Sequence, residues 1–94
     1  MRDDKFEWDD RKAAANLARH GISFETARKV FKDPIAVDES DRREEYGEDR
    51  FTRIGMADGR LLFVAYTMRE DRIRIISARG AEPYEHRVYH EKSG

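Results

Sequence analysis

Three strand-like segments joined by two very short turns constrain the fold of this 94-residue chain more than any other feature. Residues 51–56 alternate apolar and polar side chains, residues 61–67 are rich in β-branched and aromatic ones, and residues 72–78 form the last segment. Asp58-Gly59 is typical of a tight hairpin, and Glu70-Asp71 is an equally short connection. Because such short connections join antiparallel neighbours, the sequence predicts an antiparallel meander.

A short strand and a helix are predicted at the start of the chain. The strand covers Phe6–Trp8, and the helix body runs over Arg11–His20. Asp9 or Asp10 is the expected N-cap, because a carboxylate accepts from the free N–H groups of the first turn. Gly21 is a natural residue to follow the last turn. The expected apolar face of this helix consists of Ala13, Ala14, Leu17 and Ala18.

A second helix is predicted between an N-cap at Ser23 and a stop at Asp33-Pro34, because the residue before proline avoids the α region. Its buried stripe is expected to be Phe24, Ala27, Val30 and Phe31. Residues Ile35–Val37 are interpreted as a short strand. Asp38–Asp49 contains seven acidic residues and little apolar pattern, so we expect an exposed, mobile loop there.

The remaining segment completes the predicted fold class. Gly80 is expected to end the last strand, and Glu82–His90 to form a closing helix that tolerates Pro83 in its first turn. The order of elements predicts an α+β fold, in which two N-terminal helices and a C-terminal helix pack on a small antiparallel β-sheet. The length predicts a single domain over residues 1–94.

Several functional classes are excluded by composition and motifs. The chain has no cysteine and therefore no disulfide framework. It has no stretch near the roughly 18 apolar residues that a membrane helix needs, and no apolar run near its start that would indicate a signal peptide. A cytoplasmic location without membrane contact is expected. Glycine-rich phosphate loops, a nucleophile elbow and a calcium loop are absent from the sequence, so no cofactor is expected.

The distribution of charge is more informative than its sum. The formal net charge is −1, which identifies no partner, but residues 1–50 carry −3 and residues 51–94 carry +2. Seven of the eight basic residues in the second part are arginines, whose planar fork suits phosphate or carboxylate. Strict alternation would place Arg72 and Arg74 on one face of the last strand and Arg79 on the other. From residue chemistry alone, a solvated sheet edge is favoured over a phosphate site.

Histidines supply further candidates. His20 ends the first helix, where the helix dipole favours a cation. His86 and His90 lie four residues apart on the closing helix, a spacing that can hold a metal, but no third ligand accompanies them in a known motif. No metal site is therefore expected. A small basic sheet with interleaved aromatic residues could also simply bind RNA.

Two ordered blocks of residues follow the pattern of a known family. The first consists of Phe6-Glu7-Trp8-Asp9, Lys12, Asn16, His20-Gly21-Ile22-Ser23-Phe24, Val30-Phe31 and Asp33-Pro34. The second consists of Arg50-Phe51, Ile54-Gly55, Gly59-Arg60-Leu61-Leu62, Tyr66-Thr67, Arg69, Arg74-Ile75-Ile76-Ser77-Ala78-Arg79, Ala81, Glu85 and Tyr89. Over residues 6–90 the chain thus resembles the BrnT-type toxins.

The resemblance implies a fold, an activity and partners. The fold would be the compact one of the RelE/ParE group, with helices on an antiparallel sheet. The chain would be the toxin of a type II toxin–antitoxin module, a metal-independent ribonuclease that inhibits translation. Its partners would be substrate RNA and a BrnA-like DNA-binding antitoxin, through which alone it would reach operator DNA. A homodimer and a heterotetramer with the antitoxin both remain open.

The resemblance also gives the arginines specific roles. Arg69 and Arg79 are expected to hold one phosphate together, because preorganised cations stabilise the charge that develops during RNA cleavage. Arg74 and Arg60 are expected to help bind the RNA. The chain departs from the family pattern at Gly80, where a second basic residue often follows the position of Arg79.

Three residues are candidates for proton transfer or its support, and the chain also allows an alternative function. His20 is the candidate general base or acid, because its unperturbed pKa lies near neutral pH. Tyr89 and Glu85 are further candidates for proton transfer or support. Arg19 stands before His20 where the family often has lysine. The alternative is a non-catalytic binding module whose basic sheet docks RNA or an acidic segment of a partner.

Overall fold

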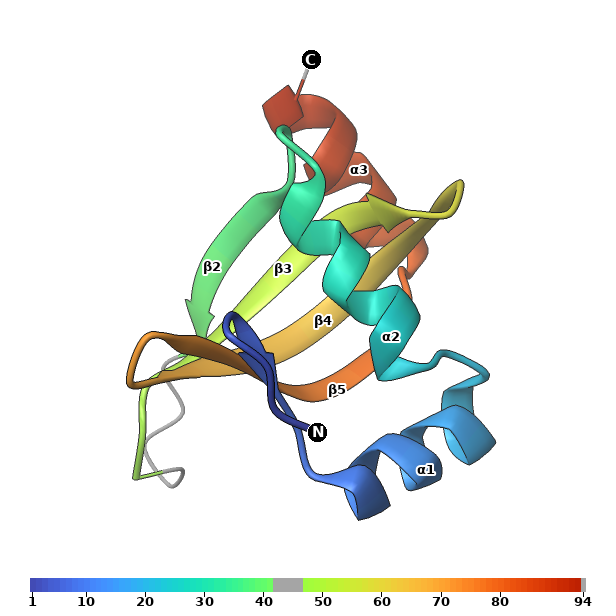
Figure 1. Ribbon diagram of the computed structural model, residues 1–94. Coiled ribbons are helices and arrows are strands. Elements are labelled where there is room, and N and C mark those ends of the chain that lie inside the picture. The colour runs from blue at the N-terminus through green and yellow to red at the C-terminus, as the bar shows by residue number, and fades with distance from the viewer. Residues whose placement is uncertain (42–46, 94) are drawn as a thin grey trace.

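The computed structural model describes residues 1–41 and 47–93. The elements in chain order are β1 (Phe6–Glu7), α1 (Asp10–His20), α2 (Phe24–Ala27), the 3₁₀ helix η1 (Arg28–Lys32), β2 (Val37–Asp41), β3 (Arg50–Ala57), β4 (Arg60–Arg69), β5 (Arg72–Gly80) and α3 (Pro83–Ser93). The strands form one sheet in the order β1-β5-β4-β3-β2 (Figure 1). The α+β class is confirmed, and the sheet is mixed because β1 runs parallel to β5 while the other neighbours are antiparallel.

The two predicted hairpins are present. Asp58 and Gly59 have φ angles of 51° and 79°, so both central residues of the β3–β4 turn are left-handed, as the right-handed twist of the flanking strands requires. Glu70 has a φ of 57° in the β4–β5 turn. These turns fix the register of the meander, which pairs Ala57 with Arg60 and Arg69 with Arg72.

The helix boundaries follow from local capping. The side chain of Asp9 accepts hydrogen bonds from the backbone N–H groups of Arg11 and Lys12, and Gly21 closes α1 with a φ of 71°. Ser23 caps α2 by accepting from the N–H of Thr26. Both predicted N-terminal helices are therefore confirmed, although the second becomes a 3₁₀ helix after Ala27.

The predicted apolar face of α1 is wrong except for Ala13, which is partly buried against the core. Leu17 is 49% exposed, and its neighbours Ala14 and Ala18 are also exposed, whereas the polar Asn16 is buried. The reason is that α1 lies alongside an uncovered length of the β5 edge, which presents backbone polar groups. The side chain of Asn16 donates to the carbonyl oxygen of Ala78 at 2.8 Å and accepts from its N–H at 3.1 Å. A buried amide thus completes the edge of the strand.

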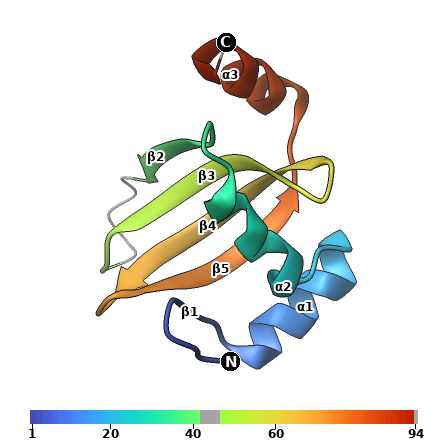
Figure 2. The same cartoon turned by 45° about the horizontal axis from the view of Figure 1, so that its top comes forward.

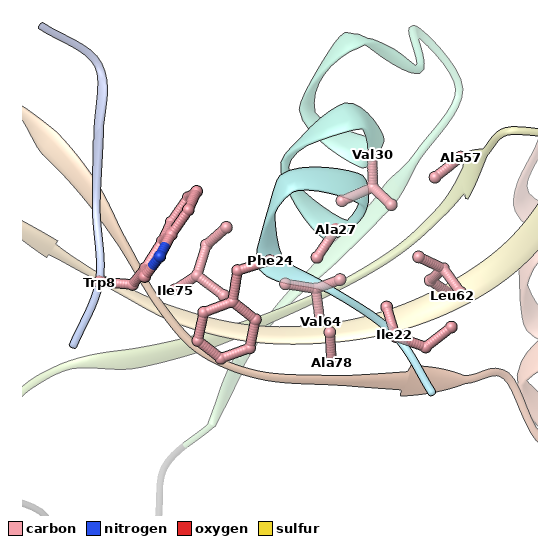
Figure 3. Close-up of a cluster of buried hydrophobic side chains, with 10 residues drawn as sticks. All are labelled: Trp8, Ile22, Phe24, Ala27, Val30, Ala57, Leu62, Val64, Ile75 and Ala78. Carbon is pink, nitrogen blue, oxygen red and sulfur yellow. The ribbon is translucent and has the colours of Figure 1, made fainter. Parts of the chain in front are cut away.

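The two faces of the sheet carry separate apolar clusters. On one face, Phe24, Ala27 and Val30 from α2 and η1 pack against Leu62 and Val64 of β4, which confirms most of the predicted stripe (Figure 3). On the opposite face, α3 contributes Tyr89 to a smaller cluster with Val37, Ile54 and Leu61. Helix α3 lies at one end of the sheet, separate from α1 and α2 (Figure 2).

Strand β2 begins later than predicted. It covers Val37–Asp41, and Ile35 is 48% exposed, so Ile35–Val37 is not the strand. The expected loop over Asp38–Asp49 is likewise wrong at its start. Asp38 pairs with Arg53 of β3, and the two side chains form ion-pair contacts of 2.7 Å. The acidic residues at the start of this segment therefore form a strand because they pair with β3. The expectation for residues 42–46 lies outside the described residues.

A β-bulge in β5 changes which side chains share a face. Ile75 and Ala78 both belong to the core cluster under α2, although an odd number of positions separates them. The register explains this, because Tyr66 pairs with Ile75 and Ala65 with Ser77, which leaves Ile76 as the extra residue. The sequence-based expectation that Arg79 faces away from Arg74 is therefore wrong. The bulge brings both to the face opposite α2.

Candidate functional site

The sheet face opposite α2, here called the open face, is covered by α3 only at one end. Beside α3 lies a groove of about 350 Å³, whose lining includes Arg50, Thr52, Phe63, Ile76, Ser77 and Tyr84. The bulge contributes two successive lining residues, Ile76 and Ser77. The groove therefore combines hydroxyl groups, aromatic rings and a basic residue on a strand platform, and two acidic residues of β2, Glu39 and Asp41, also line it.

Arg79 lies next to this groove and is held in a defined orientation. Its guanidinium lies over the ring of Phe63, with 4.3 Å between the guanidinium carbon and the ring centroid. Both carboxylate oxygens of Glu85 accept from it, at 2.8 and 2.9 Å. The hydrogen bond that Arg79 donates to Glu85, with the nearby charges of Glu85 and Glu82, raises the pKa of Arg79 against the opposing effect of burial. A planar cation is thus fixed between a ring and a carboxylate, with 30% of its side chain exposed.

Glu85 anchors two parts of the site together. Its side chain is 1% exposed, and besides Arg79 it accepts a hydrogen bond from the backbone N–H of Glu82 at 2.8 Å. This reach back to the residue before Pro83 is half of a capping box and fixes the start of α3. Its oxygens are occupied by donors, which fits the support role that the sequence suggested for Glu85 better than proton transfer.

Arg69 lies at the far end of the open face from Arg79. Arg69 pairs with Arg72 beside the β4–β5 turn, whereas Arg79 pairs with Phe63. Six residues of β4 separate those positions, which is about 20 Å along the strand. The expectation that Arg69 and Arg79 hold one phosphate together is therefore wrong. Arg69 is 53% exposed, and its ion pair with Glu48 is long, at 3.8 Å.

Arg74 occupies the open face between those two positions. It pairs with Thr67, four residues from Phe63 on β4, so Arg74 and Arg79 lie about 13 Å apart along the sheet. The guanidinium of Arg74 contacts Glu7 of β1 at 2.6 Å. Both side chains of this pair are largely buried at the edge of the sheet.

Arg60 occupies the space above Gly80. A Cβ atom built on Gly80 would lie 2.6 Å from the Nη2 atom of Arg60. By alternation from Leu62, Arg60 belongs to the helix-covered face, although it lies close to the residue that follows Arg79. The guanidinium of Arg60 thus lies over Gly80, on the face of the sheet opposite to Arg79.

The structure does not bring His20 to the open face beside Arg79. His20 lies one helical turn beyond Asn16, whose amide bonds Ala78 on the β5 edge. That position is near the end of β5 that carries Arg79, but it belongs to α1 at the edge of the sheet (Figure 2).

Tyr89 faces away from the groove into the cluster under α3. It is 5% exposed, and its hydroxyl donates to Asp33 at 2.7 Å. Burial, together with the hydrogen bond and the charge of Asp33, raises the pKa of Tyr89 to about 12. Burial acts to raise the pKa of Asp33, but hydrogen bonds from Met56, Tyr89 and Ile35 outweigh it and hold that pKa below 3.8. This contact ties α3 to the segment after η1.

Sequence reasoning missed Phe63 and Tyr84. Phe63 could have been identified from its position opposite Arg79 in the hairpin, but that register depends on the bulge, which the sequence does not reveal. The signal for Tyr84 was its position in the first turn of a helix that begins directly after β5. In nucleic-acid-binding proteins, exposed aromatic rings next to phosphate-binding arginines can stack on bases.

Two further observations concern metals and membranes. The rings of His86 and His90 are 6.4 Å apart, and residues 1–41 and 47–93 contain no group of three or more potential ligands that could hold a metal ion. Within the same residues, no helix is long and apolar enough to cross a membrane.

Comparison with known proteins gives one match. The model of a family described as the ribonuclease toxin BrnT, of type II toxin–antitoxin systems, matches residues 8–85. That span covers most of the chain and contains α1, the whole meander and the Arg79–Glu85 pair. A search of curated proteins finds no match.

Proposed function

The chain belongs to the BrnT family of type II toxin–antitoxin ribonuclease toxins, and we propose that it cleaves RNA on the open face without a metal, thereby inhibiting translation. The observation that carries the site assignment is the guanidinium of Arg79, fixed over Phe63 by Glu85 beside the groove. Family membership implies an antitoxin partner. We propose that this partner is BrnA-like and that it neutralises the toxin.

The proposed reaction needs a cation where negative charge develops. The 2′-hydroxyl of the substrate loses its proton and attacks the neighbouring phosphate, which gains charge as the O2′–P bond forms. The P–O5′ bond then breaks, the 5′-oxygen leaves with a proton as a hydroxyl, and a 2′,3′-cyclic phosphate remains. Arg79 donates to the phosphate oxygens, and its fixed position avoids reorganisation during the reaction. Glu85 supports this role because it holds the guanidinium plane while 30% of the Arg79 side chain remains exposed.

The other arginines of the open face extend the binding surface. Arg74 and Arg69 follow Arg79 along the sheet, so we propose that they contact phosphates further along the same strand of RNA. Arg60 lies over Gly80 on the helix-covered side, and we propose that it strengthens the positive potential at that end of the sheet.

We propose that His20 transfers the proton. An imidazole can act as an acid or a base, and RNA that passes the end of β5 would reach both His20 and Arg79. Tyr89 is assigned a structural role in place of proton transfer, because its hydroxyl is bound to Asp33 and its pKa is raised to about 12.

Arg79→Ala tests the proposed function, with Arg11→Ala as the matched control. Both changes remove one arginine, but Arg11 lies exposed on α1, outside the groove. Each protein is induced in bacteria for a growth assay, and each purified protein is incubated with RNA in the presence of chelator. Wild type and Arg11→Ala should arrest growth and cleave RNA, and Arg79→Ala should lose about 100-fold or more of the cleavage rate.

The outcomes distinguish an enzyme that cleaves RNA from a protein that only binds it. Undiminished cleavage by Arg79→Ala would refute the assignment of Arg79. Cleavage that disappears with chelator would refute the metal-independent reaction. His20→Gln should reduce cleavage without weakening RNA binding, and normal cleavage by this variant would remove His20 from the mechanism.

One observation favours a second candidate, a non-catalytic binding module. The guanidinium groups of Arg69, Arg74 and Arg79 each contact a carboxylate, and no histidine lies among the groove-lining residues of the described chain. Such a surface could dock RNA or an acidic partner segment without cutting anything. This candidate predicts that the wild-type protein binds RNA and leaves it intact under the conditions of the cleavage assay.

A further inference from the structure

Tyr84 is an exposed aromatic residue at the mouth of the groove, and the proposed reaction makes no use of it. Its exposed fraction is 55%, the highest among the large hydrophobic side chains exposed in the described chain. It lines the groove together with Phe63 and Ser77. A ring in this position presents an uncovered π-face to whatever enters the groove.

The position of Tyr84 is fixed relative to Arg79. Tyr84 lies in the first turn of α3, between Pro83, which restricts its own φ angle, and Glu85. Glu85 accepts from the N–H of Glu82 and also binds Arg79 with both carboxylate oxygens. One buried carboxylate therefore sets both the start of the helix that carries the ring and the orientation of the cation.

We propose that Tyr84 stacks on an unpaired base of single-stranded RNA, beside the phosphate that Arg79 contacts. This inference rests on the proposed role of the groove in RNA binding. A fixed cation next to an exposed ring matches the alternation of phosphate and base that a single strand presents, and stacking of this kind tolerates any base. In a duplex the faces of the bases are already stacked on their neighbours. The site therefore selects single-stranded over double-stranded RNA.

Binding of a non-cleavable RNA tests this proposal. The probe is a fluorescent single-stranded oligonucleotide with 2′-O-methyl groups, which lacks the nucleophile, and binding is measured by anisotropy. A second probe has the same backbone with abasic positions, and a third is a duplex. The variants are Tyr84→Ala and Tyr84→Phe, with Met68→Ala as the control because Met68 is similarly exposed but lies outside the groove.

The proposal predicts a pattern across probes and variants. Tyr84→Ala should weaken binding of the single strand about tenfold, whereas Tyr84→Phe and Met68→Ala should stay within about twofold of wild type. Wild type and Tyr84→Ala should bind the abasic probe equally, and wild type should prefer the single strand to the duplex. Cleavage of unmodified RNA by wild type is measured in parallel.

Three results would overturn the stacking role. They are equal binding of the single strand by wild type and Tyr84→Ala, a Tyr84→Ala defect that persists on the abasic probe, and a preference of wild type for duplex. If wild type cleaves RNA while any of these holds, the stacking proposal alone is refuted. If wild type neither binds nor cleaves RNA, the proposed function fails as well.

Discussion

Arg74 and Arg79 project from the same face of β5, although five positions separate them in the chain. Their partners on β4 are Thr67 and Phe63, which lie four positions apart. The difference of one residue is Ile76, which the bulge leaves without a partner. The row of arginines on the open face therefore depends on the bulge, which absorbs the additional residue in β5.

Deletion of Ile76 should preserve the native fold. The shortened strand would alternate regularly, so Ile75 and Ala78 would stay in the core under α2 and Arg79 would keep the face of Arg74. We expect a loss of about 0.5–3 kcal/mol in the free energy of unfolding, less than the about 5–15 kcal/mol of a domain of this kind. Circular dichroism and denaturant titration measure this loss.

The matched control for the deletion is Ile76→Ala. It keeps the length of β5 and shortens only a half-buried side chain, so we expect a loss of about 1 kcal/mol. If the deletion abolished folding while Ile76→Ala did not, the register described for β5 would be incorrect.

Glu85→Gln should destabilise the protein and loosen Arg79. The amide cannot accept on both sides of the guanidinium, and its NH₂ group would face a donor. We expect a loss of about 1–3 kcal/mol in the free energy of unfolding. Glu82→Gln is the control, because Glu82 is 63% exposed and should contribute less than about 1 kcal/mol. Chemical denaturation compares the two, and similar losses for both would argue against the anchoring role of Glu85.

Local patterns were sufficient to predict most elements of the fold. The capping residues Asp9 and Ser23, and the positive φ angle at Gly21, act within a few residues of themselves, so the sequence displays them directly. The Asp58-Gly59 turn fixes the register of β3 and β4 for the same reason. Strand β2 could not be read this way, because its acidic residues become a strand only through pairing with Arg53 and its neighbours.

The candidate site was predicted only in part because it depends on register. Arg79 and Glu85 were identified as candidates, but nothing local reveals the bulge at Ile76 that sets the face of Arg79. The separation of Arg69 from Arg79 follows from which end of the hairpin each occupies, and a phosphate role assigned by residue type ignores that distance.

Asn16→Ala should cost more stability than Leu17→Ala, contrary to what hydrophobic patterning would suggest. Asn16 bonds both backbone groups of Ala78 and also donates to the carbonyl oxygen of Ile22 at 3.0 Å, all in a buried setting. Its removal leaves several buried polar groups unpaired, for which we expect a loss of about 2–4 kcal/mol. Leu17 is half-exposed, and its truncation should cost about 1 kcal/mol or less. Urea titration of both variants would contradict this arrangement if Leu17→Ala proved the more damaging.

The contact between Tyr89 and Asp33 should make stability fall at alkaline pH. Burial and the bond to Asp33 raise the pKa of Tyr89 in the folded protein to about 12, from the ordinary tyrosine value of 10.0. The unfolded chain therefore releases this proton first, so the stabilisation is complete below about pH 10 and is lost as the pH rises towards 12. Tyr89→Phe should be about 1 kcal/mol less stable near pH 8, because the hydroxyl contact is gone. It should also lose less stability than wild type between about pH 10 and 12. Denaturant titrations across this range measure both effects, and parallel pH profiles for the two proteins would show that Tyr89 does not titrate with the folding transition.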